Sequence, residues 1–103
     1  MFYLNGKKIV PLNIYSHLTA IGLAYWIMDD GSKSGKGLHL NTYSFNQESI
    51  DRLLYVLQYK FELECSIHIH SKGSRIFIPS KSMPRLRDLV NPYIFPSMLY
   101  KIK

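Results

Sequence analysis

The sequence predicts an α+β domain in which helices pack behind an antiparallel sheet. Two segments, residues 20–28 and 44–61, carry the patterns of helices, the first uncharged and the second amphipathic. Two others, 38–43 and 65–70, alternate apolar and polar residues as half-buried strands do. Segments 65–70 and 75–78 are joined by a short polar turn with a glycine, so we expect them to form an antiparallel hairpin.

The N-terminal part of the chain is expected to form an arm ahead of the first long helix. Asn5-Gly6 separates two pieces flanked by apolar residues, which is a hairpin signal, and Pro11 closes the second piece. We interpret residues 1–103 as one domain, with residues 1–15 as this arm.

The segment after the arm predicts a helix without charge. Thr19 is the expected N-cap, residues 20–28 contain no charged side chain, and the helix should end at Asp29-Asp30-Gly31. A helix that is apolar on every face must be buried on all sides, which a small domain can hardly achieve alone. Two interpretations stay open: part of the helix meets another subunit or domain, or it is the central helix of the core.

The next elements predict one half-buried strand and one amphipathic helix. Residues 32–37 are expected to be a polar loop, followed by a strand that points Leu38 and Leu40 inward and His39, Asn41 and Tyr43 outward. Ser44 to Gln47 matches a capping box, Ser-x-x-Gln, at the start of a helix. Its apolar residues follow helical spacing: Ile50, Leu53, Leu54, Leu57 and Phe61.

The last third of the chain predicts the hairpin and a final helix. In the first strand Cys65, Ile67 and Ile69 should face one way, and Ser66, His68 and His70 the other. In the second strand Ile76 and Ile78 should oppose Arg75 and Phe77. A helix is expected over 83–90, with Pro84 in its first turn and Asn91-Pro92 as its end. The pattern of residues 93–103 is ambiguous.

Composition narrows the classes of function. The chain has 103 residues, a net charge of +6 and 14% aromatic residues, which favours a folded, positively charged surface over a disordered basic tail. Nucleic acid is therefore the leading partner, and charge that serves solubility alone is the alternative. No apolar run approaches the ~20 residues of a membrane span. Cys65 is the single cysteine, so no internal disulfide can form and a reducing compartment fits.

Residues 23–31, Leu-Ala-Tyr-Trp-Ile-Met-Asp-Asp-Gly, resemble the motif of the LAGLIDADG homing endonucleases. The form is similar to that of the second half of two-motif, intron-encoded proteins, and in that comparison residues 1–15 would be the remnant of a linker. Further blocks that resemble the family lie along nearly the whole chain: 5–11, 29–33, 40–42, 79–84 and 96–100.

The resemblance implies a saddle-shaped antiparallel sheet that lies on DNA, and a central pair of motif helices whose tips hold a divalent metal. Asp30 matches the family's metal-binding aspartate, and the carbonyl of Asp29 would be a second donor. The ion implied is Mg²⁺ or Mn²⁺, which prefer oxygen ligands. Lys81 is the candidate for the catalytic lysine, and an exposed lysine ahead of a helix is its plain alternative.

The resemblance also assigns surfaces. The expected nucleic-acid contacts are outward strand residues and flanking lysines: Lys33, Lys36, His39, Asn41, Tyr43, Ser66, His68, His70, Lys72 and Arg75. We expect Ala20, Ala24 and Ile27 to face a partner helix. Family members usually have small residues at the third and seventh motif positions, where this chain has Tyr25 and Asp29. Two copies of this helix would therefore bring bulk or like charge together, which favours a different half as partner over a homodimer.

Together these features predict half of a metal-dependent, site-specific DNA endonuclease of the intron-homing type. It would act only when paired with a second LAGLIDADG half, because one chain supplies a single Asp30. The alternative is a protein of the same fold that binds structured RNA without cleavage, as an intron maturase or a structural component of an RNA-protein particle such as an organellar ribosome. No membrane partner is expected. The resemblance implies the mitochondrion, or otherwise the chloroplast.

Overall fold

The computed structural model describes residues 2–4, 7–9, 13–43, 45–71 and 73–103. The strands are β1 (Phe2–Leu4), β2 (Lys7–Ile9), β3 (Gly31–Ser34), β4 (Gly37–Asn41), β5 (Ser66–His70) and β6 (Gly73–Ile78). The α-helices are α1 (Ile14–His17), α2 (Ala20–Asp30), α3 (Gln47–Tyr55) and α4 (Met83–Val90). The π-helix η1 (Val56–Lys60) continues α3, and the short 3-10 helices are η2 (Ser80–Ser82), η3 (Asn91–Tyr93) and η4 (Pro96–Ile102).

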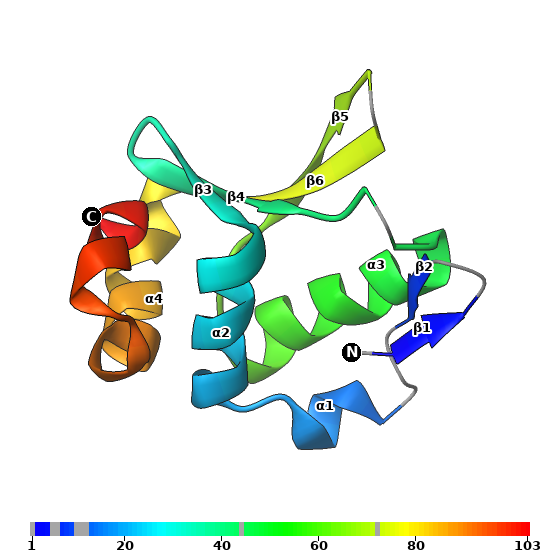
Figure 1. Ribbon diagram of the computed structural model, residues 1–103, viewed down its shortest axis with the longest axis horizontal. Helices are drawn as coiled ribbons and strands as arrows, with labels where there is room; N and C mark the ends of the chain where they lie inside the picture. Colours follow the sequence, from blue (N-terminus) through cyan, green and yellow to red (C-terminus); the bar gives the residue numbers. More distant parts are fainter. Residues whose placement is uncertain (1, 5–6, 10–12, 44, 72) are drawn as a thin grey trace.

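Four strands form an antiparallel sheet in the order β3-β4-β6-β5, and β1 pairs with β2 separately. Figure 1 shows the helices α2, α3 and α4 on one side of the sheet, while the hairpins β3–β4 and β5–β6 rise at its two ends. This is the predicted helix-backed, saddle-shaped sheet, and the predicted N-terminal hairpin also forms, with Phe2 paired to Ile9. The Asn5-Gly6 turn lies outside the described residues.

The side of the sheet that faces the helices carries the core. Leu38 and Leu40 of β4 and Ile76 and Ile78 of β6 are wholly buried, as the alternation predicts. They pack into one cluster with apolar side chains from the three long helices, Leu23, Ile27, Leu53, Leu57 and Leu86. The opposite side of the sheet is called the outer face below.

Helix α2 begins and ends close to its predicted bounds. The hydroxyl of Thr19 accepts a hydrogen bond from the Gly22 N–H at 3.1 Å, and the helix continues through Asp30. Of the two interpretations left open for this helix, its burial favours the one in which the domain does not cover it completely: Ile21 and Tyr25 are 45% and 55% exposed. Together with the exposed Asp29 they follow a spacing of four residues, so they form one exposed stripe along a helix that is otherwise in the core.

Three other expectations are corrected. Residues 32–37 are not a loop: β3 pairs with β4 through a tight turn at Gly35-Lys36, where Gly35 has a φ of +58° that glycine adopts without strain. Helix α3 is capped by Asn46, whose side-chain oxygen accepts from the Ser49 N–H at 2.8 Å, and Ser44 lies outside the described residues.

The third correction concerns the β5–β6 hairpin. Ile69 was expected to face inward with the core, and it is 86% exposed, because the hairpin tip extends past the helices that cover the rest of the sheet (Figure 1). Nearer the middle of the sheet the expected side-chain directions of the hairpin are confirmed, because Ile76 and Ile78 of β6 are buried. Cys65 precedes β5, and the predicted helix over residues 83–90 forms as α4.

Candidate nucleic-acid and metal interface

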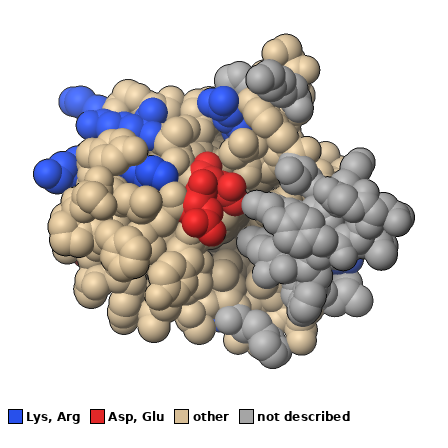
Figure 2. All heavy atoms as spheres, in the orientation of Figure 1, with Lys and Arg blue, Asp and Glu red and all other residues tan. Residues whose placement is uncertain are grey.

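The C-terminal tip of α2 presents two consecutive carboxylates. Asp29 is exposed and Asp30 is half-buried at the point where α2 passes directly into β3. Figure 2 shows acidic side chains gathered over this helix end and basic side chains over the β3–β4 turn and the C-terminal segment. The tip is therefore open to a ligand, and the partial negative charge of a helix C-terminus adds to that of the carboxylates.

The backbone at this tip is fixed by close contacts. The Gly31 N–H caps the helix by donating to the Ile27 carbonyl. A side chain at Gly31 would place its Cβ 2.5 Å from that same carbonyl oxygen, so glycine is required by space rather than by φ, which is −82°. Gly31 is thus part of what sets the position of Asp30.

Lys101, in the C-terminal 3-10 helix η4, also reaches this tip, and the sequence had not singled it out. Its ammonium donates to the carbonyl oxygen of Met28 at 2.7 Å, across 73 positions of the chain. This contact satisfies a carbonyl of the last helical turn and places a positive charge one residue from Asp29. Nothing in the spacing of the sequence could pair residues so far apart.

Lys81, the predicted catalytic lysine, lies in η2 beyond the end of β6. Its ammonium is ion-paired with the carboxylate of Glu64, and both side chains are largely exposed. The Ser82 hydroxyl accepts from the Glu64 N–H at 2.9 Å and so ties the same two segments together. The structure therefore joins Lys81 to the segment before β5, whereas Lys101 contacts the end of α2.

The donors present at the tip fit a hard divalent cation. Carboxylate and carbonyl oxygens are the ligands that Mg²⁺ and Mn²⁺ prefer, and Mg²⁺ is commonly held by one or two carboxylates together with waters and phosphates. Within the described part of the chain, no group of three or more His, Cys, Asp and Glu is placed to hold a metal ion. Asp30 and the Asp29 carbonyl would thus share the ion with a phosphate rather than enclose it.

The outer face carries the predicted base-reading side chains, several already in contact with one another. The Nε2 of His39 and the Nδ1 of His68 are 3.0 Å apart, and both rings lie against Phe77, with His68 stacked at 4.5 Å between centroids. The guanidinium of Arg75 donates to the Tyr43 hydroxyl at 2.9 Å and lies over its ring. These side chains form an aromatic and cationic surface across β4, β6 and β5.

The other predicted contacts divide into three groups. Ser66 is exposed next to this surface, in register with Phe77. Asn41 uses its side-chain oxygen to accept from the Tyr43 N–H at 2.9 Å, which closes a local turn. Lys72 lies outside the described residues, and of His70 only the backbone is described, paired with Gly73.

Lys33 and Lys36 lie in the β3–β4 hairpin, at one edge of the sheet. Lys33 pairs with Leu38 in the β3–β4 register, so it points to the helix side of the sheet and not to the outer face. Together with Lys36 it lines a hollow of about 380 Å³ against α4. The binding of nucleic acid by these two lysines stays a prediction.

The predicted helix interface is also corrected. Ala24 and Ile27 are wholly buried within this chain's own core and have no surface left for a partner, and Ala20 is half-buried. The residues of α2 that do reach the surface are Ile21, Tyr25 and Asp29. The sequence contained a signal for this exposed face of α2, since Tyr25 and Asp29 occupy the third and seventh positions of the motif.

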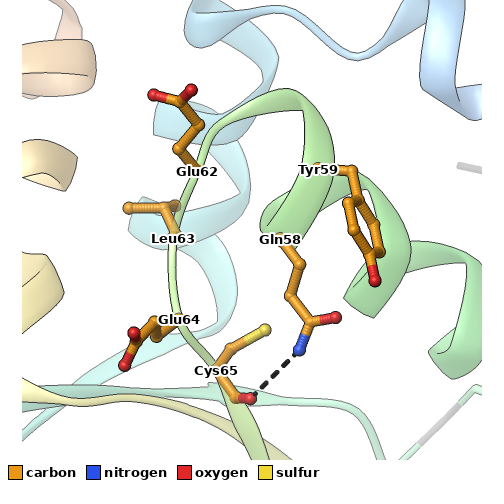
Figure 3. A pocket seen from close by; sticks show the side chains of 6 residues that line it. All are labelled: Gln58, Tyr59, Glu62, Leu63, Glu64 and Cys65. Carbon is orange, nitrogen blue, oxygen red and sulfur yellow. Dashed lines mark hydrogen bonds between the residues drawn. The ribbon is translucent and has the colours of Figure 1, made fainter.

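The side of the molecule near Cys65 does not resemble a reactive centre. A hollow of about 620 Å³ is lined there by Gln58, Tyr59, Glu62, Leu63, Glu64 and Cys65 (Figure 3). Burial raises the pKa of the Cys65 thiol from 9.0 to about 11, while a hydrogen bond with Gln58 lowers it by less. The thiol is therefore protonated at neutral pH and is a poor nucleophile.

Comparison with known proteins agrees with this fold. Residues 1–86 match the model of the LAGLIDADG DNA endonuclease family, and the chain belongs to that family. It is 40% identical to a cytochrome b mRNA maturase bI2 of Debaryomyces hansenii and 40% identical to a probable intron-encoded endonuclease 1 of Wickerhamomyces canadensis, in each case over 98% of this chain. These alignments cover 39% and 47% of the two relatives.

A solved structure, the homing endonuclease I-WcaI bound to its DNA recognition sequence, superimposes with a TM-score of 0.89 at 39% identity. The match covers 99% of this chain and 49% of that one. The chain thus spans about half of I-WcaI and less than half of the two relatives named above. In the described residues no helix is both long and apolar enough to span a bilayer.

Proposed function

We propose that this chain is one half of a divalent-metal-dependent, site-specific DNA endonuclease of the intron-homing type. The observation that carries the proposal is the open acidic tip of α2, Asp29 and Asp30, at the start of a sheet whose outer face is aromatic and cationic. Relatives named as intron-encoded endonucleases, and the DNA-bound homing endonuclease of the same fold, support it.

In this proposal each group of residues has a separate task. The outer face and the lysines near it bind DNA, because cationic side chains attract phosphates and aromatic and polar ones reach base edges. Asp30 and the Asp29 carbonyl hold Mg²⁺ or Mn²⁺. A bound ion of this kind activates water and stabilises the leaving oxygen when a phosphodiester is cut. Lys101 and Gly31 keep the tip in place, and Lys81 stays a candidate for balancing charge near the cut.

The sharpest test compares two neighbouring carboxylates. The chain is mixed with the part of the Wickerhamomyces canadensis relative that it does not match, and supercoiled plasmids carrying organellar DNA are the substrate. Asp30→Asn should abolish this half's cut, so that the pair yields nicked circles instead of linear DNA. Asp29→Asn should leave cleavage intact, because Asp29 offers its backbone carbonyl. Equal loss in both variants, or full cleavage by Asp30→Asn, would contradict the assignment.

The proposed partner is a second, non-identical LAGLIDADG half that packs on the exposed stripe of α2, made by Ile21, Tyr25 and Asp29. The large exposed fractions of Ile21 and Tyr25 and the coverage of only about half of I-WcaI both support a missing half. Self-association is disfavoured, since it would set Tyr25 against Tyr25 or Asp29 against Asp29.

This pairing can be tested with a matched control. Ile21→Asp should prevent a 1:1 complex with the partner half in size-exclusion chromatography with light scattering. Ile69→Asp removes an isoleucine that is even more exposed but lies at the hairpin tip, so it should leave the complex unchanged. A stable homodimer of the unmodified chain, lost in Ile21→Asp, would replace the hetero-pair with a symmetric one.

A second function, RNA binding without cleavage, is favoured by two relatives named cytochrome b mRNA maturase, each 40% identical to this chain. The same surface suits both ligands, because attraction to phosphate does not distinguish DNA from RNA. Co-purification of a structured RNA with both the unmodified chain and Asp30→Asn, with no DNA cleavage by either, would establish this function instead of the nuclease.

The compartment proposed is the mitochondrion, with the chloroplast as the alternative. Support comes from the same two relatives, whose names refer to cytochrome b mRNA. Fractionation of the source cells followed by mass spectrometry of the mitochondrial and plastid fractions tests this proposal. Recovery in the cytosolic fraction alone would contradict it.

A further inference from the structure

A row of three exposed tyrosines lies where α1 meets the end of α3 and the π-helix η1, and it is called the tyrosine row below. Tyr15 contacts Tyr55 at 5.7 Å between ring centroids, and Tyr55 contacts Tyr59 at 4.7 Å. The three residues are 42%, 56% and 65% exposed. Figure 1 shows α1 and this end of α3 at the side of the molecule away from the two hairpins of the sheet. The tyrosine row is therefore separate from the outer face.

Two hollows adjoin the tyrosine row, and they differ in character. The first has a volume of about 170 Å³ and is mainly apolar, lined by Ile14, Tyr15, Arg52, Tyr55 and Val56. The second is the hollow of about 620 Å³ near Cys65, which Tyr59 lines together with Glu62 and Glu64 (Figure 3). Because the rings of Tyr55 and Tyr59 are in contact, the row connects the apolar hollow with the acidic one.

The elements that carry this surface are joined before any ligand binds. The ammonium of Lys60 donates to the carbonyl oxygens of Tyr15 and Leu18, at 2.6 and 2.8 Å, and lies 5.7 Å from the centroid of the Tyr15 ring. These contacts join α1 to η1 across 45 and 42 positions of the chain. A π-helix such as η1 is rare in proteins and is found frequently at functional sites. A surface that is already ordered loses less entropy when a ligand binds.

The cations beside the tyrosine row are already engaged, which disfavours nucleic acid as the ligand. Lys60 donates to two carbonyls, and Arg52 is ion-paired with Glu48 at 3.6 Å. Nucleic-acid binding depends on cations that neutralise phosphates. Tyrosine and arginine side chains, in contrast, are enriched where proteins bind one another. The tyrosine row therefore favours a protein ligand.

The second hollow places negative charge at one end of the row. The side chains of Glu62 and Glu64 are 72% and 65% exposed, and each is ion-paired with one cation, Arg85 or Lys81. Exposed ion pairs contribute only about 0–1 kcal/mol, so they compete weakly with a ligand. Each carboxylate also has about four lone-pair sites and can accept from a further donor. This acidic end favours a ligand with a basic side chain.

We propose that the tyrosine row and its two hollows bind an extended, proline-containing segment of a partner protein. Polyproline segments dock in grooves lined by aromatic side chains, because they are already extended and lose little chain entropy. An aliphatic side chain of the segment fills the apolar hollow, and a lysine or arginine enters the acidic hollow beside Glu62 and Glu64. This site goes beyond the nuclease and RNA-binding functions proposed above, because neither uses these residues.

The geometry also sets the spacing of the two anchoring side chains. Tyr55 and Tyr59 are four residues apart, which is about 6 Å along a helix, and a polyproline chain rises about 3.1 Å per residue. About two residues of the segment therefore span the row. An aliphatic residue, two prolines and a basic residue, in either chain direction, fit this spacing.

The first experiment measures, by fluorescence anisotropy, the affinity of the full chain for two labelled peptides with the central sequences Leu-Pro-Pro-Arg and Arg-Pro-Pro-Leu. The unmodified chain should bind at least one of them. Tyr55→Ala with Tyr59→Ala should weaken that binding by about 30-fold or more, as is typical of a binding hot spot. The control, Tyr93→Ala with Tyr100→Ala, removes two tyrosines of similar exposure from η3 and η4 and should leave the affinity unchanged. Binding of neither peptide, or an equal loss in both double variants, overturns the proposal.

The second experiment tests the acidic hollow. Replacing the arginine of the bound peptide by glutamine should weaken binding by about 10-fold, the effect of losing one hydrogen bond between charged groups. Glu62→Gln with Glu64→Gln should remove this preference and leave the affinity for the glutamine peptide unchanged. A preference for arginine that persists in this double variant contradicts the assignment of the basic side chain to the acidic hollow.

A third measurement needs no variant and so does not depend on how a variant folds. Amide NMR shifts of the unmodified chain, followed during titration with the peptide, should change mainly in α1, in residues 52–59 and in residues 62–65. Changes confined to the outer face or to α2 overturn the proposal. If single-stranded RNA binds instead of the peptide, and this binding is lost in the Tyr55→Ala, Tyr59→Ala variant, the row is a stacking surface for RNA and the assignment to protein is wrong.

Discussion

Replacing Gly31 by alanine should damage the tip of α2 more than any other glycine substitution in this helix or in the adjoining hairpin turn. The added Cβ would lie 2.5 Å from the Ile27 carbonyl oxygen and 3.2 Å from the Ile27 carbonyl carbon and Cα. All three are backbone atoms that cannot rotate away, so helix and strand must move apart. Overpacking of this kind costs about 1–3 kcal/mol. In a domain of this size that corresponds to a fall in Tm of roughly 4–8 °C per kcal/mol.

Two other glycines serve as matched controls. A Cβ at Gly22 would meet side-chain atoms, Leu18 Cδ1 at 3.2 Å and Thr19 Oγ1 at 3.6 Å, and alanine gains about 1 kcal/mol of helix propensity over glycine. Gly22→Ala should therefore leave stability unchanged or raised. At Gly35 no atom lies within 4 Å, but the φ of +58° costs an L-residue about 1–2 kcal/mol. The expected order of destabilisation is Gly31, then Gly35, then Gly22.

The assay has two parts, urea denaturation of each variant and DNA cleavage with the partner half at a temperature where all three variants are folded. Gly31→Ala should lose cleavage even while folded, because it displaces the backbone that carries Asp30. Gly22→Ala and Gly35→Ala should retain it. If Gly31→Ala is as stable and as active as Gly22→Ala, the close approach between Gly31 and Ile27 does not set the geometry of the site.

Three further predictions concern single side chains. Lys101→Met should destabilise the chain by about 1.5–3 kcal/mol in urea denaturation, because it removes a charged hydrogen bond and leaves the Met28 carbonyl unsatisfied, and Lys101→Arg should restore part of the loss. Alkylation of Cys65 at pH 8 should be about 100-fold slower than alkylation of a thiol with the ordinary pKa. Folding raises the pKa of this thiol, so the protonated thiol contributes to the free energy of unfolding below pH 9.0, and this contribution is lost as pH rises toward about 11. Glu62→Gly should leave thermal stability unchanged or raise it by up to about 1 kcal/mol. Glycine adopts the φ of 57° at this position without strain, and the exposed ion pair between Glu62 and Arg85 contributes little to stability. A clear loss of stability would show that the ion pair contributes more than the backbone strain costs.

Local signals in the sequence were enough to place most elements. Pro84 and Asn91-Pro92 bound a helix that forms over Met83–Val90, because proline suits a first helical turn and disrupts a later one. Thr19 caps α2 as predicted, since a hydroxyl in that position satisfies an otherwise unpaired N–H. The alternation of Leu38 and Leu40 with polar neighbours correctly gave the buried side of β4.

The parts that could not be predicted depend on tertiary contacts. Ile69 alternates correctly with its neighbours, but no pattern shows that helices fail to reach the hairpin tip. Lys33 looks like any loop lysine until β3 is known to pair with β4, which then directs its side chain to the helix side. Lys101 contacts Met28 only because η4 returns to the end of α2. Each case requires the arrangement of elements, which one sequence does not contain.

The exposed stripe of α2 shows how these two levels combine. The absence of charge in residues 20–28 left two interpretations open, a partner beside this helix or complete burial in the core, and the residues expected to face a partner included Ala24 and Ile27. Packing of the core decides which face of α2 stays exposed: Ala24 and Ile27 are buried in the core, and Ile21 and Tyr25 remain exposed. Asp29 lies on the same stripe, so a partner that covers the stripe also brings its own helix tip beside Asp30. Pairing and catalysis should therefore depend on the same surface, and a partner half with small residues opposite Tyr25 is the one that this surface can accept.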